Sequence, residues 1–204
     1  MRTLGVVSAG LLFVFTATSA HAGGVDGTGA VGTCATVGQI KIKPALVNGG
    51  TSPGGLKVKT AGTTACSGGT GDGANVISSK GKGTATTTTN DCASLAGSQP
   101  SNLMLTVKWK TTKGTPKLNP STISITGQTG SASSTPPNHG EFQVTGTVTA
   151  GSFSGDTVSG TIITDQDLNE ILAACGAKGL KKITFGLAPS KDDMQMGSGS
   201  FTIN

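Results

Sequence analysis

We predict an all-β protein, a single β-sandwich of about ten strands with one short helix. Three features of the 204-residue sequence lead to this prediction. Many short segments alternate apolar and polar residues, as in Ile40-Lys41-Ile42-Lys43, which is the pattern of half-buried strands. Clusters of Gly, Pro, Ser and Asn separate these segments and predict turns. The four cysteines are an even number, so we expect two disulfides to brace the fold.

Residues 1–22 have the layout of a cleavable secretory signal peptide. Met1-Arg2 supplies a positive start, Leu4 to Ala17 is almost unbroken apolar sequence, and Ala20-His21-Ala22 resembles a cleavage site. The apolar run is shorter than the ~20 residues that a spanning helix needs. We therefore expect a secreted or cell-envelope protein with no membrane span after signal cleavage, in a compartment where cysteines oxidise.

The rest of the chain is expected to form one domain over 37–204, preceded by a flexible, Gly-rich lead-in over 23–36. Strand candidates recur with turn clusters between them. They lie at about 37–46, 55–62, 74–79, 83–90, 103–112, 121–127, 140–150, 152–163, 181–188 and 198–204.

The disulfide pairing follows from the register of the first two strand candidates. If they form a hairpin centred near Gly50, Ile42 faces Val58 and Cys34 falls opposite Cys66. We therefore predict the disulfide Cys34–Cys66 and, by elimination, Cys92–Cys175. No two cysteines are close enough in sequence to suggest a zinc site.

A helix is predicted at about 165–175, because Leu168, Ile171, Leu172 and Cys175 recur at helical spacing. Thr164 is the expected N-cap. The disulfide from Cys175 would then attach this helix across one open end of the sandwich.

Several short motifs resemble those of exported bacterial β proteins of actinobacterial type whose role is uncharacterised. The motifs are an early cysteine, G-x-I-K-I-K-P, C-x-G-G, D-C-x-x-L, V-K-W-K, G-x-F-x-G and a late cysteine in a helix. This resemblance covers most of the chain after residue 22 and implies no activity.

Lysines alternate with apolar residues along three strand candidates and form a candidate binding face. They are Lys41, Lys43, Lys57, Lys59, Lys108 and Lys110. Lysine is expected to face lysine across the first two strands, which is unfavourable unless something offsets it. One explanation is solvation together with protection of a sheet edge. The other is a cationic face that contacts an anionic polymer of the cell envelope or another surface protein.

Other chemistry-bearing residues favour structural roles. Trp109 shares its parity with Leu105 and Val107, so it is expected to point into the core. His139 lies in a Ser/Pro-rich segment and is expected to be a solvent-exposed loop residue. Asp165 to Glu170 begins like a calcium loop but lacks the turn glycine, so these acids are expected to cap the helix. We expect no metal or cofactor.

These observations predict a non-enzymatic exported protein with a structural or binding role. The sequence shows no catalytic motif, and its lysines come without the arginines and aromatic residues typical of nucleic-acid binding. Two other classes stay open. One is an extracellular hydrolase with a loop-built site that pairs His139 with Glu141 or Asp156. The other is a secreted adhesin or inhibitor that acts through an edge strand or a loop such as 129–140.

Overall fold

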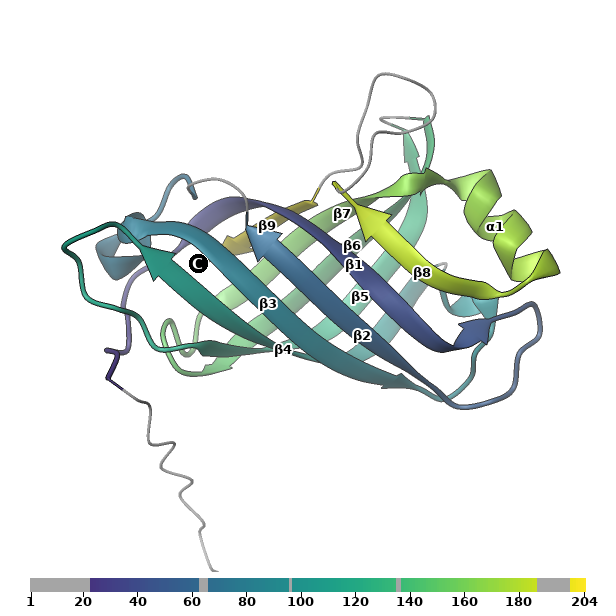
Figure 1. The fold of residues 1–204 in the computed structure, drawn as a ribbon, viewed down its shortest axis with the longest axis horizontal. Coiled ribbons are helices and arrows are strands. Elements are labelled where there is room, and N and C mark those ends of the chain that lie inside the picture. The colour runs from purple at the N-terminus through teal and green to yellow at the C-terminus, as the bar shows by residue number, and fades with distance from the viewer. Residues whose placement is uncertain (1–22, 63–65, 96, 135–136, 187–198) are drawn as a thin grey trace, which may run out of the picture.

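The computed structural model describes residues 23–62, 66–95, 97–134, 137–186 and 199–204. The predicted signal peptide over 1–22 lies outside these residues. The described part is almost entirely β structure with one α-helix (Figure 1). Its elements are β1 (Gly32–Leu46), β2 (Gly54–Gly62), η1 (Gly71–Asn75), β3 (Val76–Thr87), η2 (Cys92–Leu95), β4 (Gly97–Thr111), β5 (Ser121–Ser134), β6 (Pro137–Ala150), β7 (Thr157–Asp167), α1 (Leu168–Ala177), β8 (Leu180–Phe185) and β9 (Gly199–Ile203).

The strands form one closed β-barrel, so the predicted β-sandwich is wrong. The antiparallel sheet runs in the order β2-β3-β4-β5-β6-β7-β9-β1, and β1 also pairs with β2, which closes an eight-strand ring. Consecutive strands from β1 to β7 are neighbours, whereas β9 returns from the end of the chain to join β7 to β1. Closure leaves the eight strands of this ring without a free sheet edge, and among the described strands β8 pairs with β1 alone.

Strand β1 holds the barrel together because it pairs with three other strands. One of its edges pairs with β2 over residues 36–43. Its other edge pairs with β9 over 32–35 and with β8 from residue 38 onward. Side chains at the end of β7 also bind β8: Gln166 Oε1 accepts from the Thr184 amide at 3.0 Å, and Asp165 Oδ1 accepts from the Gly186 amide at 2.7 Å.

The alternation seen in the sequence separates the inside of the barrel from its outside. Inward positions carry apolar residues and outward positions carry Lys, Thr and Ser. Glycines make room for the largest inward rings. A Cβ on Gly38 would lie 2.5 Å from the ring of Phe185, and one on Gly160 would lie 2.9 Å from the ring of Phe201.

The two barrel ends are closed differently. At one end, residues from the lead-in pack into the barrel: Val31 is fully buried, and Val25 bridges to Leu118. The Trp109 indole donates to Ser121 Oγ at 2.8 Å and meets the Phe153 ring edge-on, with centroids 5.5 Å apart. The inward orientation predicted for this tryptophan is thus confirmed.

At the other end, helix α1 packs through Ile171 and Cys175 against an apolar cluster that includes Phe142 and Leu46. The helix begins at Leu168 rather than at 165, and Asp167 is its N-cap, accepting from the Asn169 amide at 2.7 Å. Thr164 is not the cap, because strand β7 continues to Asp167, which pairs with His139 of β6.

Both predicted disulfides are confirmed, Cys34–Cys66 and Cys92–Cys175. The predicted hairpin register is shifted, since Ile42 pairs with Leu56 and not with Val58. Farther along, Thr33 bridges Ser67, which restores the predicted offset next to Cys34. Two disulfides indicate a protein of an oxidising, extracytoplasmic environment.

Strand β3 corrects another expectation, because it is one continuous strand where the sequence predicted two. The segment 80–82 falls between the strand candidates at 74–79 and 83–90. It pairs on one side with β2 and on the other with β4. The barrel therefore has one strand fewer in this region than the sandwich prediction required.

Candidate ligand-binding cavity and lysine face

A cavity of about 440 Å³ occupies the interior of the barrel toward the end that carries α1. Every strand contributes to its wall. The apolar part of the lining is Ile40, Ile42, Leu46, Leu56, Val58, Ala85, Leu95, Leu103, Leu105, Ile125, Phe142, Val144, Ile162, Ile183, Phe185 and Phe201. Volumes of 300–1,000 Å³ with predominantly apolar walls are typical of small-molecule sites.

The cavity exists because one strand presents small residues to the interior. The inward positions of β3 include Gly81, Gly83 and Ala85, while β2 and β4 on either side place Leu56 and Leu105 inward. Neighbouring side chains lean over the glycines: a Cβ on Gly83 would lie 2.5 Å from a Leu105 methyl. Beside Ala85 the barrel is not filled.

The cavity reaches solvent through a polar rim. Thr86 and Thr88, at the end of β3, and Asn102 of β4 line the cavity and are themselves exposed. The Asn102 side chain bridges the two segments, accepting from the Thr86 amide at 3.0 Å and donating to Thr86 Oγ1 at 2.8 Å. Thr87, Thr89, Ser94 and Gln128 add further polar groups near this rim.

The described part of the wall is uncharged. The described residues that line the cavity include no Lys, Arg, His, Asp or Glu, and their polar members are Thr, Ser, Asn and Gln. These groups hydrogen-bond but do not supply a counter-charge.

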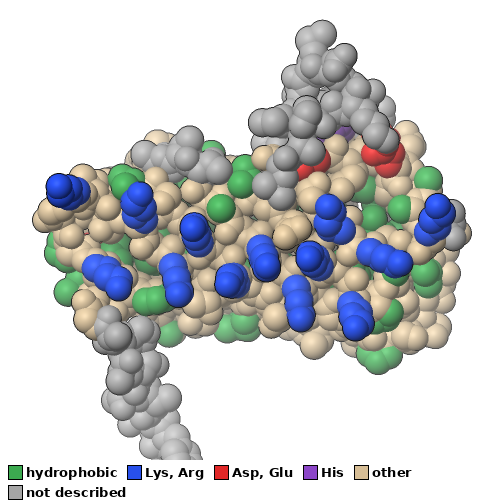
Figure 2. Space-filling view, in the orientation of Figure 1, with side chains coloured by type: hydrophobic (Ala, Val, Ile, Leu, Met, Phe, Trp, Pro, Cys, Tyr) green, Lys and Arg blue, Asp and Glu red, His purple; other side chains and the backbone are tan. Residues whose placement is uncertain are grey.

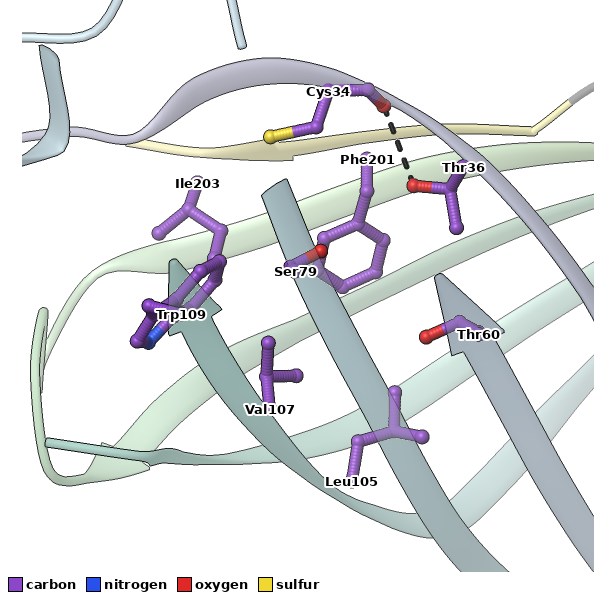
Figure 3. Close-up of a pocket in the computed structure, with 9 residues that line it drawn as sticks. All are labelled: Cys34, Thr36, Thr60, Ser79, Leu105, Val107, Trp109, Phe201 and Ile203. Carbon is purple, nitrogen blue, oxygen red and sulfur yellow. Dashed lines mark hydrogen bonds between the residues drawn. The ribbon is translucent and has the colours of Figure 1, made fainter. Parts of the chain in front are cut away.

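A smaller void of about 40 Å³ lies deeper in the barrel, toward the end that contains Trp109. Figure 3 shows Trp109, Val107 and Leu105 of β4 pointing inward across from Ile203 and Phe201 of β9. Leu105 and Phe201 belong to the walls of both spaces, so they separate the void from the larger cavity. The void is too small for more than about one water-sized group.

The outer surface of strands β1 to β4 and β8 is cationic, and we call it the lysine face. It comprises the exposed residues Lys41, Lys43, Lys57, Lys59, Lys80, Lys82, Lys108, Lys110 and Lys182. Figure 2 shows lysines along the whole length of this face, over β1 to β4 and β8, and the acidic side chains visible in that view lie near its upper right margin. The lysines predicted from the sequence all belong to it.

Lysines lie directly opposite one another across four strand pairs. The pairs are Lys41 with Lys57, Lys41 with Lys182, Lys59 with Lys82, and Lys80 with Lys108. In the part of the chain that the structure describes, none of these lysines forms an ion pair. Like charges in this arrangement destabilise a sheet, so the folded protein keeps an unfavourable charge pattern.

The structure corrects the expectation of an exposed histidine. His139 lies in strand β6 and its side chain is 2% exposed. Its Nδ1 lies 2.6 Å from the carbonyl oxygen of Thr164, so Nδ1 carries the proton of this hydrogen bond. Asp156 lies before the start of β7, whereas His139 pairs with Asp167 at the other end of that strand. The structure therefore does not bring His139 and Asp156 together. The other proposed partner, Glu141, lies two residues from His139 on β6, and its Oε1 accepts from Gln143 Nε2 at 3.2 Å.

The acidic segment before α1 serves the fold. Asp165 accepts from the amide of Gly186, and Asp167 caps the helix. Among the described residues no group of three or more His, Cys, Asp or Glu is placed to hold a metal ion. The loop predicted over 129–140 is replaced by the paired ends of β5 and β6, apart from residues 135–136, which lie outside the described part.

Comparisons with protein-family models, with curated proteins and with solved structures find no match. Over the described residues, no helix has the length and apolar character needed to cross a membrane.

Proposed function

We propose that this protein binds a small, largely apolar molecule inside its barrel, as a secreted or cell-envelope binding protein. The observation that carries the proposal is the cavity of about 440 Å³, walled by aliphatic and aromatic side chains and open at a polar rim. An apolar molecule is removed from water on all sides in such a space, at a gain of about 25 cal/mol per Å² of apolar surface.

The size of the cavity limits the ligand. At about 30 Å³ for each water-sized group, the cavity of 440 Å³ accommodates roughly fifteen non-hydrogen atoms. Ligand efficiencies between the limits for tiny and drug-sized molecules then give dissociation constants around the micromolar range. A linear chain of twelve carbons fits this limit.

Filling the cavity should weaken binding without unfolding the barrel. Ala85 lines the cavity between Leu56 and the rim, so Ala85→Phe places a ring in the ligand space. The neutral fluorescent probe N-phenylnaphthylamine is expected to bind the wild type saturably at one site and the variant about tenfold or more weakly. Its emission is measured during titration, and circular dichroism reports the fold.

Thr84→Phe is the matched control, because Thr84 is the preceding residue on β3 and is exposed on the outer surface. It should bind the probe like the wild type. A wild type that does not bind the probe, or an Ala85→Phe protein that is folded and binds it unchanged, would overturn the proposal.

We propose a second function for the lysine face, contact with an anionic polymer of the cell envelope. Four directly opposed lysine pairs are retained on one outer face without ion-pair partners in the described structure. A polymer of phosphodiesters or carboxylates would supply the missing counter-charge along the face and relieve the repulsion.

Retention on immobilised polyglutamate tests this second function. Lys57→Gln combined with Lys59→Gln should elute at clearly lower salt than the wild type, since both residues lie within the lysine face. Lys113→Gln combined with Lys117→Gln removes the same charge from the connection between β4 and β5 and should change retention much less. Equal shifts for the two variants would mean that only net charge matters, and the proposed face would be rejected.

A further inference from the structure

A β-bulge turns a polar side chain into the apolar cavity. Ile123 and Ile125 of β5 are buried and paired with Val148 and Gly146 of β6. Strict alternation would place Gly127 inward next. The register between β5 and β6 shifts after Ile125, however, and Gln128 lines the cavity instead. Bulges commonly re-aim a side chain beside a functional site.

The surroundings of Gln128 leave its amide available to a ligand. On the neighbouring strand β6 it pairs with Val144, an apolar residue of the cavity lining. Within the described residues its carboxamide makes no hydrogen bond, whereas the Asn102 side chain at the rim accepts one hydrogen bond from Thr86 and donates one to it. Gln128 therefore offers two donors and one acceptor beside apolar residues of the cavity lining.

The rest of the wall restricts the ligand's charge. The described residues of the lining supply no ionisable side chain to balance an ion inside the cavity. An unpaired carboxylate or ammonium loses its hydration there and gains no counter-charge, which is far more costly than the burial of a hydroxyl or carbonyl that finds a hydrogen-bond partner.

From these two features we propose that the cavity selects an uncharged amphiphile, a long-chain alcohol, ester or similar neutral lipid, whose polar group binds the Gln128 carboxamide. This inference rests on the proposed ligand-binding function and names its ligand class. The apolar chain would lie among Ile40, Leu105 and Phe201, and the polar group would face the rim.

Two ligands of equal chain length test, on the wild-type protein, whether the cavity prefers an uncharged ligand. Dodecanol and dodecanoate are compared for displacement of N-phenylnaphthylamine at pH 8, where the acid is ionised. Dodecanol is expected to compete at about tenfold or more lower concentration. If dodecanoate competes equally well or better while the probe binds, the inference fails and the proposed function survives. If the probe itself does not bind, the proposed function has failed first.

Substitution of the amide tests its role. Gln128→Met keeps the length of the side chain and removes its hydrogen-bonding groups, so dodecanol affinity should fall about three- to tenfold. Gln143→Met is the matched control, because Gln143 is exposed on the outer surface of β6. Unchanged dodecanol affinity in a Gln128→Met protein that still binds the probe would overturn the role of Gln128.

Discussion

Single glycines decide how closely the strands of this barrel approach one another. Gly146 of β6 lies over β5, where a Cβ would come within 2.1 Å of the Ser124 carbonyl oxygen. Gly55 of β2 is also a strand glycine, yet a Cβ there would be 3.6 Å or more from any neighbour. The two residues look alike in the sequence, so only the structure distinguishes a required glycine from a replaceable one.

Gly146→Ala should therefore destabilise the protein and Gly55→Ala should not. At Gly146 the added methyl group meets backbone atoms that cannot rotate away, so we expect a loss of about 1–3 kcal/mol in the free energy of unfolding. At Gly55 the methyl group fits, and reduced freedom of the unfolded chain should leave stability unchanged or raise it by about 0.4–1 kcal/mol. Urea unfolding with intact disulfides measures both, and equal effects would contradict the proposed difference.

At the scale of elements, local patterns predicted most strands and the disulfides but missed features set by distant pairing. Parity along the chain was enough to match Cys34 with Cys66, since strand partners share a face. The Lys80–Gly83 segment, in contrast, has the composition of a turn. It is a strand because β2 and β4 both pair with it, and these partners cannot be recognised from the segment itself. Lys80 and Lys82 were missed for the same reason.

The helix end of the barrel depends on the second disulfide. Cys92–Cys175 joins η2 to α1 over a sequence separation of 83 residues, and the helix has only one apolar stripe on the barrel. Replacing both cysteines with alanine should lower the free energy of unfolding by about 4 kcal/mol, through the freedom regained by the unfolded chain.

Hydrogen exchange adds a local measurement to this prediction. Amides of α1 should lose protection in the double variant before those of β4 and β5, because the helix loses its covalent attachment while the strands keep their neighbours. Uniform loss of protection across the barrel would instead show that α1 and the strands unfold as one unit.

At the scale of the whole molecule, the pattern of alternation is compatible with a sandwich or a barrel. Both bury one face of each strand, so the inward residues are the same in either case. The barrel is decided by β1, whose length lets it pair with β2 on one edge and with β9 and β8 on the other. These contacts join β1 to strands that are distant in the sequence, and no local sequence feature predicts them.

The cavity results from closure of the sheet into a barrel. It could not be predicted from the sequence as long as a sandwich was expected. Facing sheets can move together until their side chains interlock, whereas a closed ring keeps its radius. Small inward residues such as Ala85 then leave space that the chain does not fill. The bulge that brings Gln128 inward is likewise a property of the β5–β6 pairing.

The separation of an apolar interior from a cationic exterior has a measurable consequence for the stability of the whole protein. Lys41 faces lysines on both neighbouring strands, Lys57 and Lys182. Removing its charge relieves two like-charge contacts, each worth about 0.2–1 kcal/mol. Lys41→Gln should therefore raise the midpoint of thermal unfolding at low ionic strength.

The salt dependence of this rise in the unfolding midpoint identifies its cause. The Debye length is about 30 Å at 0.01 M and about 3 Å at 1 M, so added salt should stabilise the wild type and erase most of the advantage of Lys41→Gln. Lys113→Gln, outside the opposed pairs, removes the same charge and should gain much less at low salt. If the two variants gained equally, net charge alone would explain the effect. If Lys41→Gln were destabilising at every salt concentration, the opposed lysines would not repel as their register indicates.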